Sequence, residues 1–348
     1  MKYRRVPGTD IDLSEISMGT GDNAGLFVWG EYGALRGAVA RALENGVNHF
    51  DTAPEYGRGR AETNLGSVLR DLGAKPFITT KVEVADEHLG DIAKRVVHTV
   101  EESLIRLGVD AVHFVQIHNP PGKLYGRIST RRATMEVEHY LGPKGAMEGI
   151  ARLQKDGKTL HTGMSCEYAE SAQVKEILQT GLMRWINVRY NLVNPTAGVD
   201  GLDALEVDYR YDGVMAEARR YKVGTGIVRP LAGGALTDTS LQSDAIVRHP
   251  LAGGALSSNE KLMNQMKAEV ARARQLSFLC RETGDSMAVA AYRFILSHPD
   301  ATSIITGISD GSHLDDALEA VRKGPLDAAL LKRLQPIWKS NFAQGASV

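Results

Sequence analysis

Eight short runs rich in β-branched residues alternate with helix-like runs along the chain, and this alternation restricts the possible folds more than any other feature. The clearest helix is predicted over 91–107, where apolar residues recur at helical spacing and Gly108 follows as a stop signal. Strands that alternate with helices pair in parallel, and closure into a barrel is the economical arrangement of eight such strands. The strand-like runs are 15–20, 47–52, 76–82, 111–118, 159–165, 185–191, 223–229 and 302–307, and the helix-like runs are 34–45, 61–72, 91–107, 146–156, 171–180, 213–221 and 264–298, the last with a break at Thr283-Gly284.

We therefore predict the α/β class and a (β/α)8 TIM barrel, formed by residues 1–348 as a single domain. A chain of 348 residues could also hold two domains, but single barrels with loop insertions reach this length. Residues 2–13 indicate an N-terminal hairpin around Pro7-Gly8 that plugs the barrel floor. The run 327–340 indicates an extra C-terminal helix, packed outside or across the barrel.

Three strand-to-helix loops, 20–33, 119–145 and 231–263, are longer than a connection requires. All three fall on the carboxyl-end face, where barrels of this kind keep their functional sites. The third loop contains a short duplication, because Pro-Leu-Ala-Gly-Gly-Ala-Leu occurs at 230–236 and again at 250–256. We interpret the first copy as the exit of the seventh strand, and the second copy receives no role.

The composition excludes several kinds of partner. A net charge of −1 argues against nucleic acid or an anionic membrane surface. No apolar run is long enough to span a membrane, and no apolar segment follows the basic start as in a signal peptide. Cys166 and Cys280 are two isolated cysteines, which predicts a reduced cytoplasmic compartment without disulfides. The ten histidines form no short-spaced ligand cluster, so no metal is expected.

Polar residues close three successive predicted strands on this same face: Asp51 with Tyr56, Lys81, and His118. A free tyrosine has a pKa of about 10, so it is a weak acid near neutrality. A buried lysine ammonium beside it favours the phenolate and lowers that pKa, and the lysine in turn needs a carboxylate partner. We therefore interpret Tyr56 as a general acid/base, Lys81 as the charge that tunes it and Asp51 as the partner of Lys81. His118 would hold a substrate oxygen near the phenol.

Each of these residues also has an ordinary structural explanation. Asp51 could cap a turn, Tyr56 could fill a loop and His118 could be a satisfied core histidine. Lys81 could be an unremarkable strand-end lysine or could form a Schiff base with a carbonyl substrate. Two other functions therefore stay open: a catalytically idle, nucleotide-binding barrel that serves as a sensor or subunit, and a Schiff-base lyase that uses Lys81.

The ordered set Asp51, Tyr56, Lys81 and His118 resembles the aldo-keto reductase superfamily, and the resemblance covers nearly the whole chain. It implies an NAD(P)-dependent oxidoreductase that transfers a hydride between nicotinamide and a carbonyl or alcohol, with the four residues in the roles given above. Ser165 matches the family's Ser-Asn pair, whereas Cys166 replaces the asparagine, and Asn187 takes the place of a glutamine. The residues that the resemblance implies for cofactor binding are Gly19, Thr20, Asp51, Ser165, Asn187, Arg229, Leu231, Gly233, Gly307, Ser309 and His313.

The loop after the eighth strand departs from the family pattern. His313 occupies the usual arginine position, Gly307 a usual lysine position and Ala317 a usual asparagine position, while Asp310 adds a negative charge. A 2′-phosphate is bound best by arginine or lysine. We therefore expect NAD or NADP as the cofactor, with a weakened preference for NADP.

The sequence says less about the substrate, for which Trp29, Tyr56 and His118 are the candidate contacts. Aromatic residues in the first long loop suggest an apolar wall, and the polar second loop suggests a lid over a hydroxylated molecule. We expect a small-molecule partner, either a sugar or other polyol-like alcohol, or a small aldehyde or ketone. The sequence predicts no particular oligomeric state.

Overall fold

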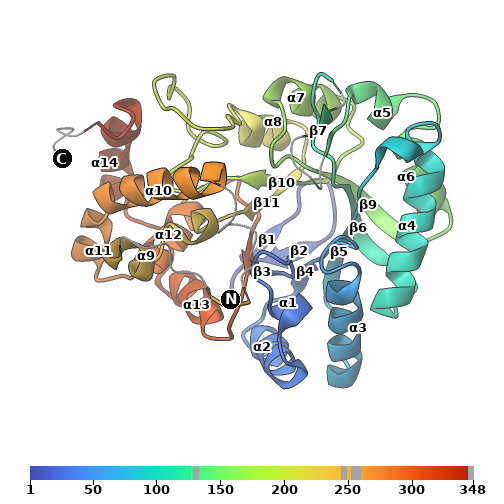
Figure 1. Cartoon of the computed structure of the whole chain (residues 1–348), viewed down its shortest axis with the longest axis horizontal. Coiled ribbons are helices and arrows are strands. Elements are labelled where there is room, and N and C mark those ends of the chain that lie inside the picture. The colour runs from blue at the N-terminus through green and yellow to red at the C-terminus, as the bar shows by residue number, and fades with distance from the viewer. Residues whose placement is uncertain (125, 128–132, 244–248, 252–259, 344–348) are drawn as a thin grey trace.

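Eight parallel strands close into a barrel in the computed structural model, which describes all residues except 125, 128–132, 244–248, 252–259 and 344–348 (Figure 1). Around the barrel the strands follow the order β3, β4, β5, β6, β9, β10, β11 and β12, after which β12 pairs with β3. The predicted (β/α)8 architecture is therefore confirmed. The strands are β3 (Ile16–Gly19), β4 (His49–Asp51), β5 (Phe77–Val82), β6 (Val112–Ile117), β9 (Thr159–Ser165), β10 (Trp185–Arg189), β11 (Gly224–Val228) and β12 (Ser303–Gly307).

Helices surround the barrel and bury their apolar faces against it. The predicted helix at 91–107 is α4 (Ile92–Leu107), where Asp91 accepts a hydrogen bond from the Lys94 N–H and Gly108 ends the helix with φ of 68°. The other helices that follow barrel strands are α2 (Tyr32–Glu44), α3 (Arg60–Leu72), α6 (Ala146–Lys155), α7 (Ser171–Gln179), α8 (Val214–Arg220) and α13 (His313–Lys323).

The N-terminal hairpin seals one end of the barrel, as predicted. Its strands β1 (Tyr3–Arg5) and β2 (Asp12–Ser14) pair antiparallel, with Tyr3 opposite Ser14. Apolar side chains of this hairpin form a separate small core with side chains that fill the barrel interior, which leaves the carboxyl-end face as the open face. This core comprises Val6, Ile11, Leu13, Phe114, Trp185 and Ile305.

The C-terminal third has one more helix break than the sequence predicts. The segment 264–298 lies in three helices: α10 (Glu260–Gln275), α11 (Phe278–Thr283) and α12 (Met287–Leu296). The predicted break is present, because Gly284 ends α11 with φ of 69°. The sequence missed the earlier break before Phe278, where neither glycine nor proline marks the end of α10. The extra C-terminal helix is α14 (Ala328–Lys339), and its Trp338 indole N–H donates to the Leu192 carbonyl at 2.9 Å.

The three long loops contain structure of their own. The first holds α1 (Leu26–Trp29), and the second holds the antiparallel pair β7 (Gly126–Arg127) and β8 (Ala133–Thr134) and then α5 (Val137–Leu141). The 3₁₀ helix η1 (Asp86–His88) follows β5. In the third loop, η2 (Ala232–Gly234) directly follows β11, which confirms the first copy of the duplicated sequence as a strand exit, and α9 (Asp238–Gln242) comes next. Of the second copy, 252–256 lies outside the described residues.

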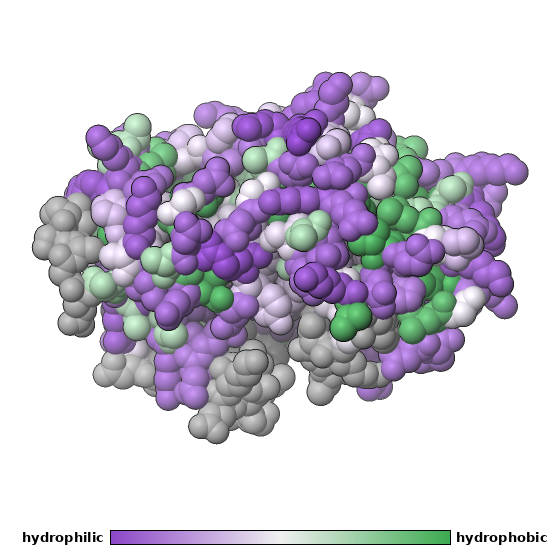
Figure 2. All heavy atoms as spheres, turned by 90° about the horizontal axis from the view of Figure 1, so that it is seen from above, coloured by the Kyte–Doolittle hydropathy of each residue, from purple (hydrophilic) through white to green (hydrophobic). Residues whose placement is uncertain are grey.

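One face of the molecule is mainly polar. Figure 2 shows a face covered chiefly by hydrophilic residues, with hydrophobic side chains gathered toward the right of the view. None of the helices in the described part of the chain has the length and hydropathy needed to cross a membrane.

Candidate active site

Lys81 lies at the centre of a buried charge cluster at the carboxyl end of the barrel. Its side chain is only 2% exposed, and its ammonium pairs with the Asp51 carboxylate and donates to the Thr52 carbonyl at 2.8 Å. Burial lowers the pKa of Lys81, but the negative charge of Asp51 and the hydroxyl of Tyr56 offset this, and the net pKa is raised above its usual 10.5. Lys81 is therefore held as an ammonium.

Tyr56 is brought over Lys81 by the turn that follows β4. The Tyr56 N–H donates to the Ala53 carbonyl at 3.2 Å, and Gly57 has φ of 60°, a left-handed conformation that glycine adopts without strain. The Lys81 Nζ lies 5.1 Å from the centre of the Tyr56 ring, and its interaction with the hydroxyl contributes to the raised pKa of Lys81. The phenol and the ammonium thus share one face of the barrel mouth.

His118 comes next to this pair from the end of β6. Its ring meets the Tyr56 ring edge-on, with the ring centres 5.8 Å apart, and the residue is only 3% exposed. Its Nδ1 lies 3.0 Å from the Glu55 Oε2. The structure therefore brings together all four predicted catalytic residues, and it adds Glu55, which the sequence analysis did not single out although it directly precedes Tyr56.

A second carboxylate approaches the same histidine. Among the residues that the structure describes, ligand atoms of Glu55, Glu83 and His118 lie within 4.8 Å of one another, a spacing that could hold a metal ion. The sequence predicted no metal because its histidines are scattered. Spacing along the sequence does not reveal this group, because its three residues follow three different strands.

Asp51 is also anchored from the opposite side of the barrel. The Asn187 Nδ2 donates to the Asp51 Oδ2 at 2.9 Å, and the Asn187 Oδ1 accepts from the Gln116 Nε2 at 3.0 Å and from the Trp185 Nε1 at 2.9 Å. The sequence analysis placed Asn187 against the cofactor carboxamide and did not foresee this network. A cofactor contact by Asn187 stays a prediction.

Several predicted cofactor residues lie at strand ends on the rim. Gly19, Ser165 and Gly307 are the last residues of β3, β9 and β12, and Gly19 pairs directly with Gly307. A side chain at Gly307 would begin 2.9 Å from the Ala24 Cβ, so the backbone approaches closely here. The Thr20 hydroxyl donates to the Thr52 hydroxyl at 2.8 Å.

The exit of β11 is a tight turn with left-handed backbone conformations. Ala232, Gly233 and Gly234 all have positive φ, at 48°, 68° and 105°, after Leu231. The Ala232 N–H donates to the Arg229 carbonyl at 3.0 Å and the Gly234 N–H to the Leu231 carbonyl at 2.8 Å, so both groups are used within the turn. The Arg229 guanidinium lies beside this loop, 3.5 Å from the Glu167 carboxylate. A pyrophosphate contact by Arg229, Leu231 and Gly233 stays a prediction.

The loop after β12 offers no positive charge at His313. The His313 Nδ1 accepts from the Ser309 N–H at 3.3 Å, and the carboxylate of Asp310 accepts from the Ser312 N–H. Partial burial lowers the pKa of His313, although Asp310 opposes this effect. His313 is therefore neutral near pH 7.

The aromatic residues of the first long loop do not form a continuous wall. Phe27 is buried in the core, and Tyr32 donates to the Asp71 carboxylate on the outside. Trp29 alone is exposed among the loop's large aromatic side chains before α2, with 51% of its surface accessible and the Arg60 guanidinium 5.1 Å from its ring centre. Of the aromatic residues predicted to form an apolar wall, only Trp29 is therefore available at the surface of this loop.

Arg189 is a charged residue at the barrel mouth that the sequence analysis missed. It ends β10 two residues after Asn187, so the alternation of the strand directs both side chains inward. Its guanidinium is 3.3 Å from the Glu167 carboxylate and 5.5 Å from the Tyr168 ring centre, and it is 3% exposed. The strand periodicity was the signal that could have identified it.

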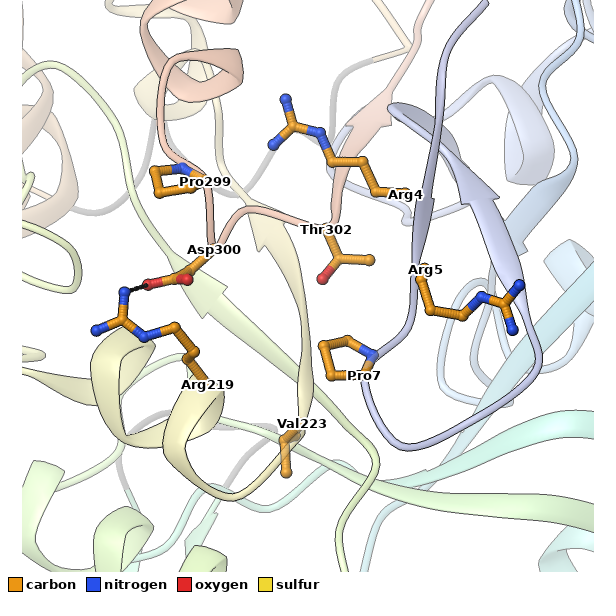
Figure 3. A pocket seen from close by; sticks show the side chains of 8 residues that line it. All are labelled: Arg4, Arg5, Pro7, Arg219, Val223, Pro299, Asp300 and Thr302. Carbon is orange, nitrogen blue, oxygen red and sulfur yellow. Dashed lines mark ion pairs between the residues drawn. The ribbon is translucent and has the colours of Figure 1, made fainter.

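A small cavity of about 80 Å³ lies at the other end of the barrel (Figure 3). Arg4, Arg5 and Pro7 of the N-terminal hairpin line one side of it, and the Arg219–Asp300 ion pair, 3.2 Å long, closes another. It contains none of the strand-end residues described above, so we assign it no catalytic role.

The structure thus combines an eight-stranded parallel barrel with Asp51, Tyr56, Lys81 and His118 at its carboxyl-end rim. The chain belongs to the aldo/keto reductase family, whose family model matches residues 31–339.

Three relatives illustrate the range of this family. The chain is 24% identical to a putative voltage-gated potassium channel subunit beta of Schizosaccharomyces pombe, over 96% of this chain and 92% of that one. It is 25% identical to L-glyceraldehyde 3-phosphate reductase of Escherichia coli K12, over 92% of this chain and 88% of that one. The solved structure of a glycerol dehydrogenase from Gluconobacter oxydans superposes with a TM-score of 0.70 at 22% identity, over 96% and 94% of the two chains. That last similarity shows the shared fold.

Proposed function

We propose that this protein is an NAD(P)-dependent oxidoreductase that interconverts a carbonyl and an alcohol, with Tyr56 as its general acid/base. The observation that carries the proposal is the buried Asp51–Lys81 ion pair directly beside the Tyr56 phenol, with His118 against the same ring. An ammonium held in place by a carboxylate favours the phenolate form of a neighbouring tyrosine. Tyr56 can then exchange a proton with a substrate oxygen near neutral pH.

Each residue of the cluster has a separate part in this chemistry. A bound nicotinamide cofactor supplies the hydride for reduction or accepts it in oxidation. Tyr56 gives its proton to the substrate oxygen when a carbonyl is reduced and takes one back when an alcohol is oxidised. Lys81 stabilises the phenolate, Asp51 keeps Lys81 charged, and His118 holds the substrate oxygen by a hydrogen bond.

The cofactor would lie along the rim formed by the ends of β9, β10, β11 and β12. Arg229 would supply a positive charge to the pyrophosphate beside the turn at 232–234, and Gly19, Thr20, Ser165 and Asn187 would contact the nicotinamide end. We propose NAD as the preferred cofactor, because the neutral His313 and the nearby Asp310 offer no charge complement to a 2′-phosphate.

For the substrate we propose a small polyhydroxylated alcohol or sugar, with a small aldehyde or ketone as the alternative. The polar groups around Tyr56, namely His118 and Glu55, can hydrogen-bond a hydroxylated molecule, and Trp29 supplies an apolar surface. The named activity of the E. coli relative, on L-glyceraldehyde 3-phosphate, supports a small hydroxylated carbonyl compound.

A subunit or sensor role is the second candidate, favoured by the similarity to the putative potassium channel subunit beta. A Schiff-base lyase is less favoured by the geometry. The ammonium of Lys81 is engaged by Asp51 and Thr52, and its raised pKa keeps the amine protonated and non-nucleophilic. Borohydride trapping of a carbonyl substrate on Lys81 would support the lyase and contradict our proposal.

The test is a screen at 340 nm with NAD(H) and NADP(H) against aldehydes, ketones, sugars and polyols. We expect turnover in the wild type and a fall of roughly 10²- to 10⁴-fold in kcat for Tyr56→Phe. Tyr3→Phe is the matched control, because this exposed tyrosine belongs to the N-terminal hairpin at the closed end of the barrel, where its hydroxyl donates to the Gly46 carbonyl. Turnover by Tyr56→Phe equal to that of the control would refute the role of Tyr56. Higher or comparable turnover with NADP(H) at equal concentration would refute the cofactor preference.

A further inference from the structure

We propose that Gly21 is a specificity-determining residue: because it carries no side chain, it leaves room at the hydroxyl end of Tyr56 for the second carbon substituent of a ketone or a secondary alcohol. This inference rests on the proposed function, in which Tyr56 exchanges a proton with the substrate oxygen. It deepens that function by naming the substrate class that the site accepts. The sequence analysis did not select Gly21 as a substrate contact.

Gly21 faces the end of the Tyr56 ring that bears the hydroxyl group. A Cβ atom on Gly21 would lie 3.7 Å from the Tyr56 Cζ, the carbon that carries the hydroxyl, and 3.9 and 4.0 Å from the adjacent ring carbons Cε2 and Cε1. A side chain at position 21 would therefore begin in contact with the reactive end of the phenol. Any group longer than a methyl would need further space around that end.

The position of Gly21 is fixed by hydrogen bonds on both sides of it. Before it, the Thr20 N–H donates to the Asp51 carbonyl at 3.0 Å. After it, the Gly21 carbonyl accepts from the N–H groups of Ala24 and Gly25, both at 3.2 Å. The loop is therefore tied to the strand end that carries Asp51, and Gly21 keeps its place opposite the phenol.

Neither backbone conformation nor close packing requires a glycine at position 21. Its φ lies outside the left-handed range, in contrast to the 60° of Gly57. A Cβ on Gly57 would lie 2.2 Å from the Val28 Cγ1, whereas for Gly21 the nearest atom among the described residues is the Tyr56 Cζ at an ordinary van der Waals distance. A side chain is thus sterically allowed at position 21, and its absence leaves the phenol uncovered from this direction.

Solvent reaches the phenol and Gly21 but hardly the other members of the cluster. Tyr56 and Gly21 are both partly exposed, whereas Lys81 and His118 are buried. The contact between Gly21 and the phenol is therefore not part of the closed core. A molecule that enters the barrel mouth can reach the phenol on the side of Gly21.

The chemistry at Tyr56 requires space for every group on the reacting carbon. A substrate oxygen that hydrogen-bonds to the Tyr56 hydroxyl lies about 2.7 Å from it, so the reacting carbon and its substituents lie near the end of the ring. An aldehyde or a primary alcohol places one carbon substituent there, whereas a ketone or a secondary alcohol places two. The second substituent needs additional space, which Gly21 provides.

The experiment compares isomers that differ in the number of carbon substituents on the reacting carbon. The probes are glyceraldehyde with dihydroxyacetone, and propanal with acetone, each reduced with NADH and with NADPH. One misfitting methylene changes specificity by roughly 10- to 200-fold. We therefore expect Gly21→Ala to lower kcat/KM for the ketone relative to the aldehyde by roughly tenfold or more, and Gly21→Leu to lower it further.

Gly37→Ala is the matched control for the added methyl group. Gly37 lies in α2, is exposed, and a Cβ there would meet no atom of the described residues within 4 Å. This variant should keep the wild-type ratio of ketone to aldehyde turnover. Gly21→Ala and Gly37→Ala should both fold, because neither methyl group makes a close contact, and urea denaturation checks this. An unchanged ratio in Gly21→Ala and Gly21→Leu would overturn the inference.

Cofactor binding separates this inference from a different reason for the glycine. If the backbone of Gly21 had to approach the cofactor, Gly21→Ala would raise the Kd of NADH and NADPH in a fluorescence titration and would slow both isomers equally. That result would overturn the inference, whereas unchanged Kd values with a selective loss of the ketone support it. The wild type supplies a measurement that needs no variant: turnover confined to the aldehydes would also overturn the inference.

The two proposals fail separately. Wild-type turnover of both isomers that Tyr56→Phe retains would refute the proposed function, whatever the Gly21 variants do. Loss of activity in Tyr56→Phe together with an indifferent Gly21 would remove only the present inference and leave the role of Tyr56 intact.

Discussion

Asn187 and Asp51, which are 136 residues apart in the sequence, are joined by a 2.9 Å hydrogen bond across the interior of the barrel. This bond ties β10 to the end of β4 and holds the carboxylate whose other oxygen pairs with Lys81. The position of the Lys81 ammonium beside Tyr56 therefore depends on both sides of the barrel. Substitutions in this chain of contacts are expected to affect stability as well as catalysis.

The first prediction concerns Asp51→Asn. It leaves the Lys81 ammonium buried with no opposing charge, so we expect the free energy of unfolding to fall by about 3–5 kcal/mol. Urea denaturation measures this loss. Asp110→Asn, at an exposed carboxylate before β6, should change stability by less than about 0.5 kcal/mol. Adding Lys81→Met to Asp51→Asn should recover stability, because no charge is then left buried. A double variant less stable than Asp51→Asn would contradict this account.

The second prediction concerns the loop after β12. His313→Arg introduces a permanent cation where the native ring is neutral, and hydrogen bonds to a charged group contribute about 1.5–3 kcal/mol. We therefore expect NADP⁺ to bind roughly 10- to 100-fold more tightly, with little change for NAD⁺. Fluorescence titration with each cofactor measures both Kd values. His313→Gln, which stays neutral, serves as control, and equal tightening by both variants would exclude charge as the cause.

The third prediction concerns acid stability. His49 is fully buried, with its ring nitrogens 2.8 Å from the Ser17 and Thr79 hydroxyls, and burial lowers its pKa from 6.5 to about 4. Between these values the unfolded chain binds a proton that the folded chain does not, so stability falls as the pH drops from 6.5 and levels off below 4. At about 1.4 kcal/mol for each pH unit, the loss is about 3–4 kcal/mol.

His49→Asn removes this titration. Between pH 6.5 and 4, the stability of this variant should depend on pH more weakly than that of the wild type. The difference between the two slopes should correspond to about one proton taken up on unfolding, as measured by denaturation at several pH values. His98→Asn, at a histidine side chain that is 63% exposed, should retain the wild-type dependence. If His49→Asn kept the full slope, His49 would not be the group responsible.

The fourth prediction concerns Trp29. Its side chain is half exposed and contacts the Arg60 guanidinium, so Trp29→Ala should cost less than about 1 kcal/mol of stability. If it contacts substrate, KM should rise severalfold while kcat stays nearly constant. Tyr32→Ala removes a comparably exposed aromatic residue on α2 and should leave KM unchanged. Identical KM values in Trp29→Ala and the wild type would remove Trp29 from the substrate site.

The fold was predictable because its signal is local and repeated. Each strand and each following helix has its own periodicity, and eight such units leave parallel closure as the economical arrangement. Where local signals were absent, the prediction was wrong: nothing in the composition marks the break between α10 and α11, whereas Gly284 correctly marked the next one. Helix ends that depend on tertiary packing have no such glycine or proline signal in the sequence.

The sequence by itself determined the barrel and the four polar residues at its strand ends, because strand ends on one face of a parallel barrel must converge. Tertiary structure alone decided the pairings among side chains: Asn187 with Asp51, Glu55 with His118 and Arg189 with Glu167. These contacts join residues far apart in the chain, and they depend on strand register and side-chain conformation. Residue type and spacing along one segment carry no information about either.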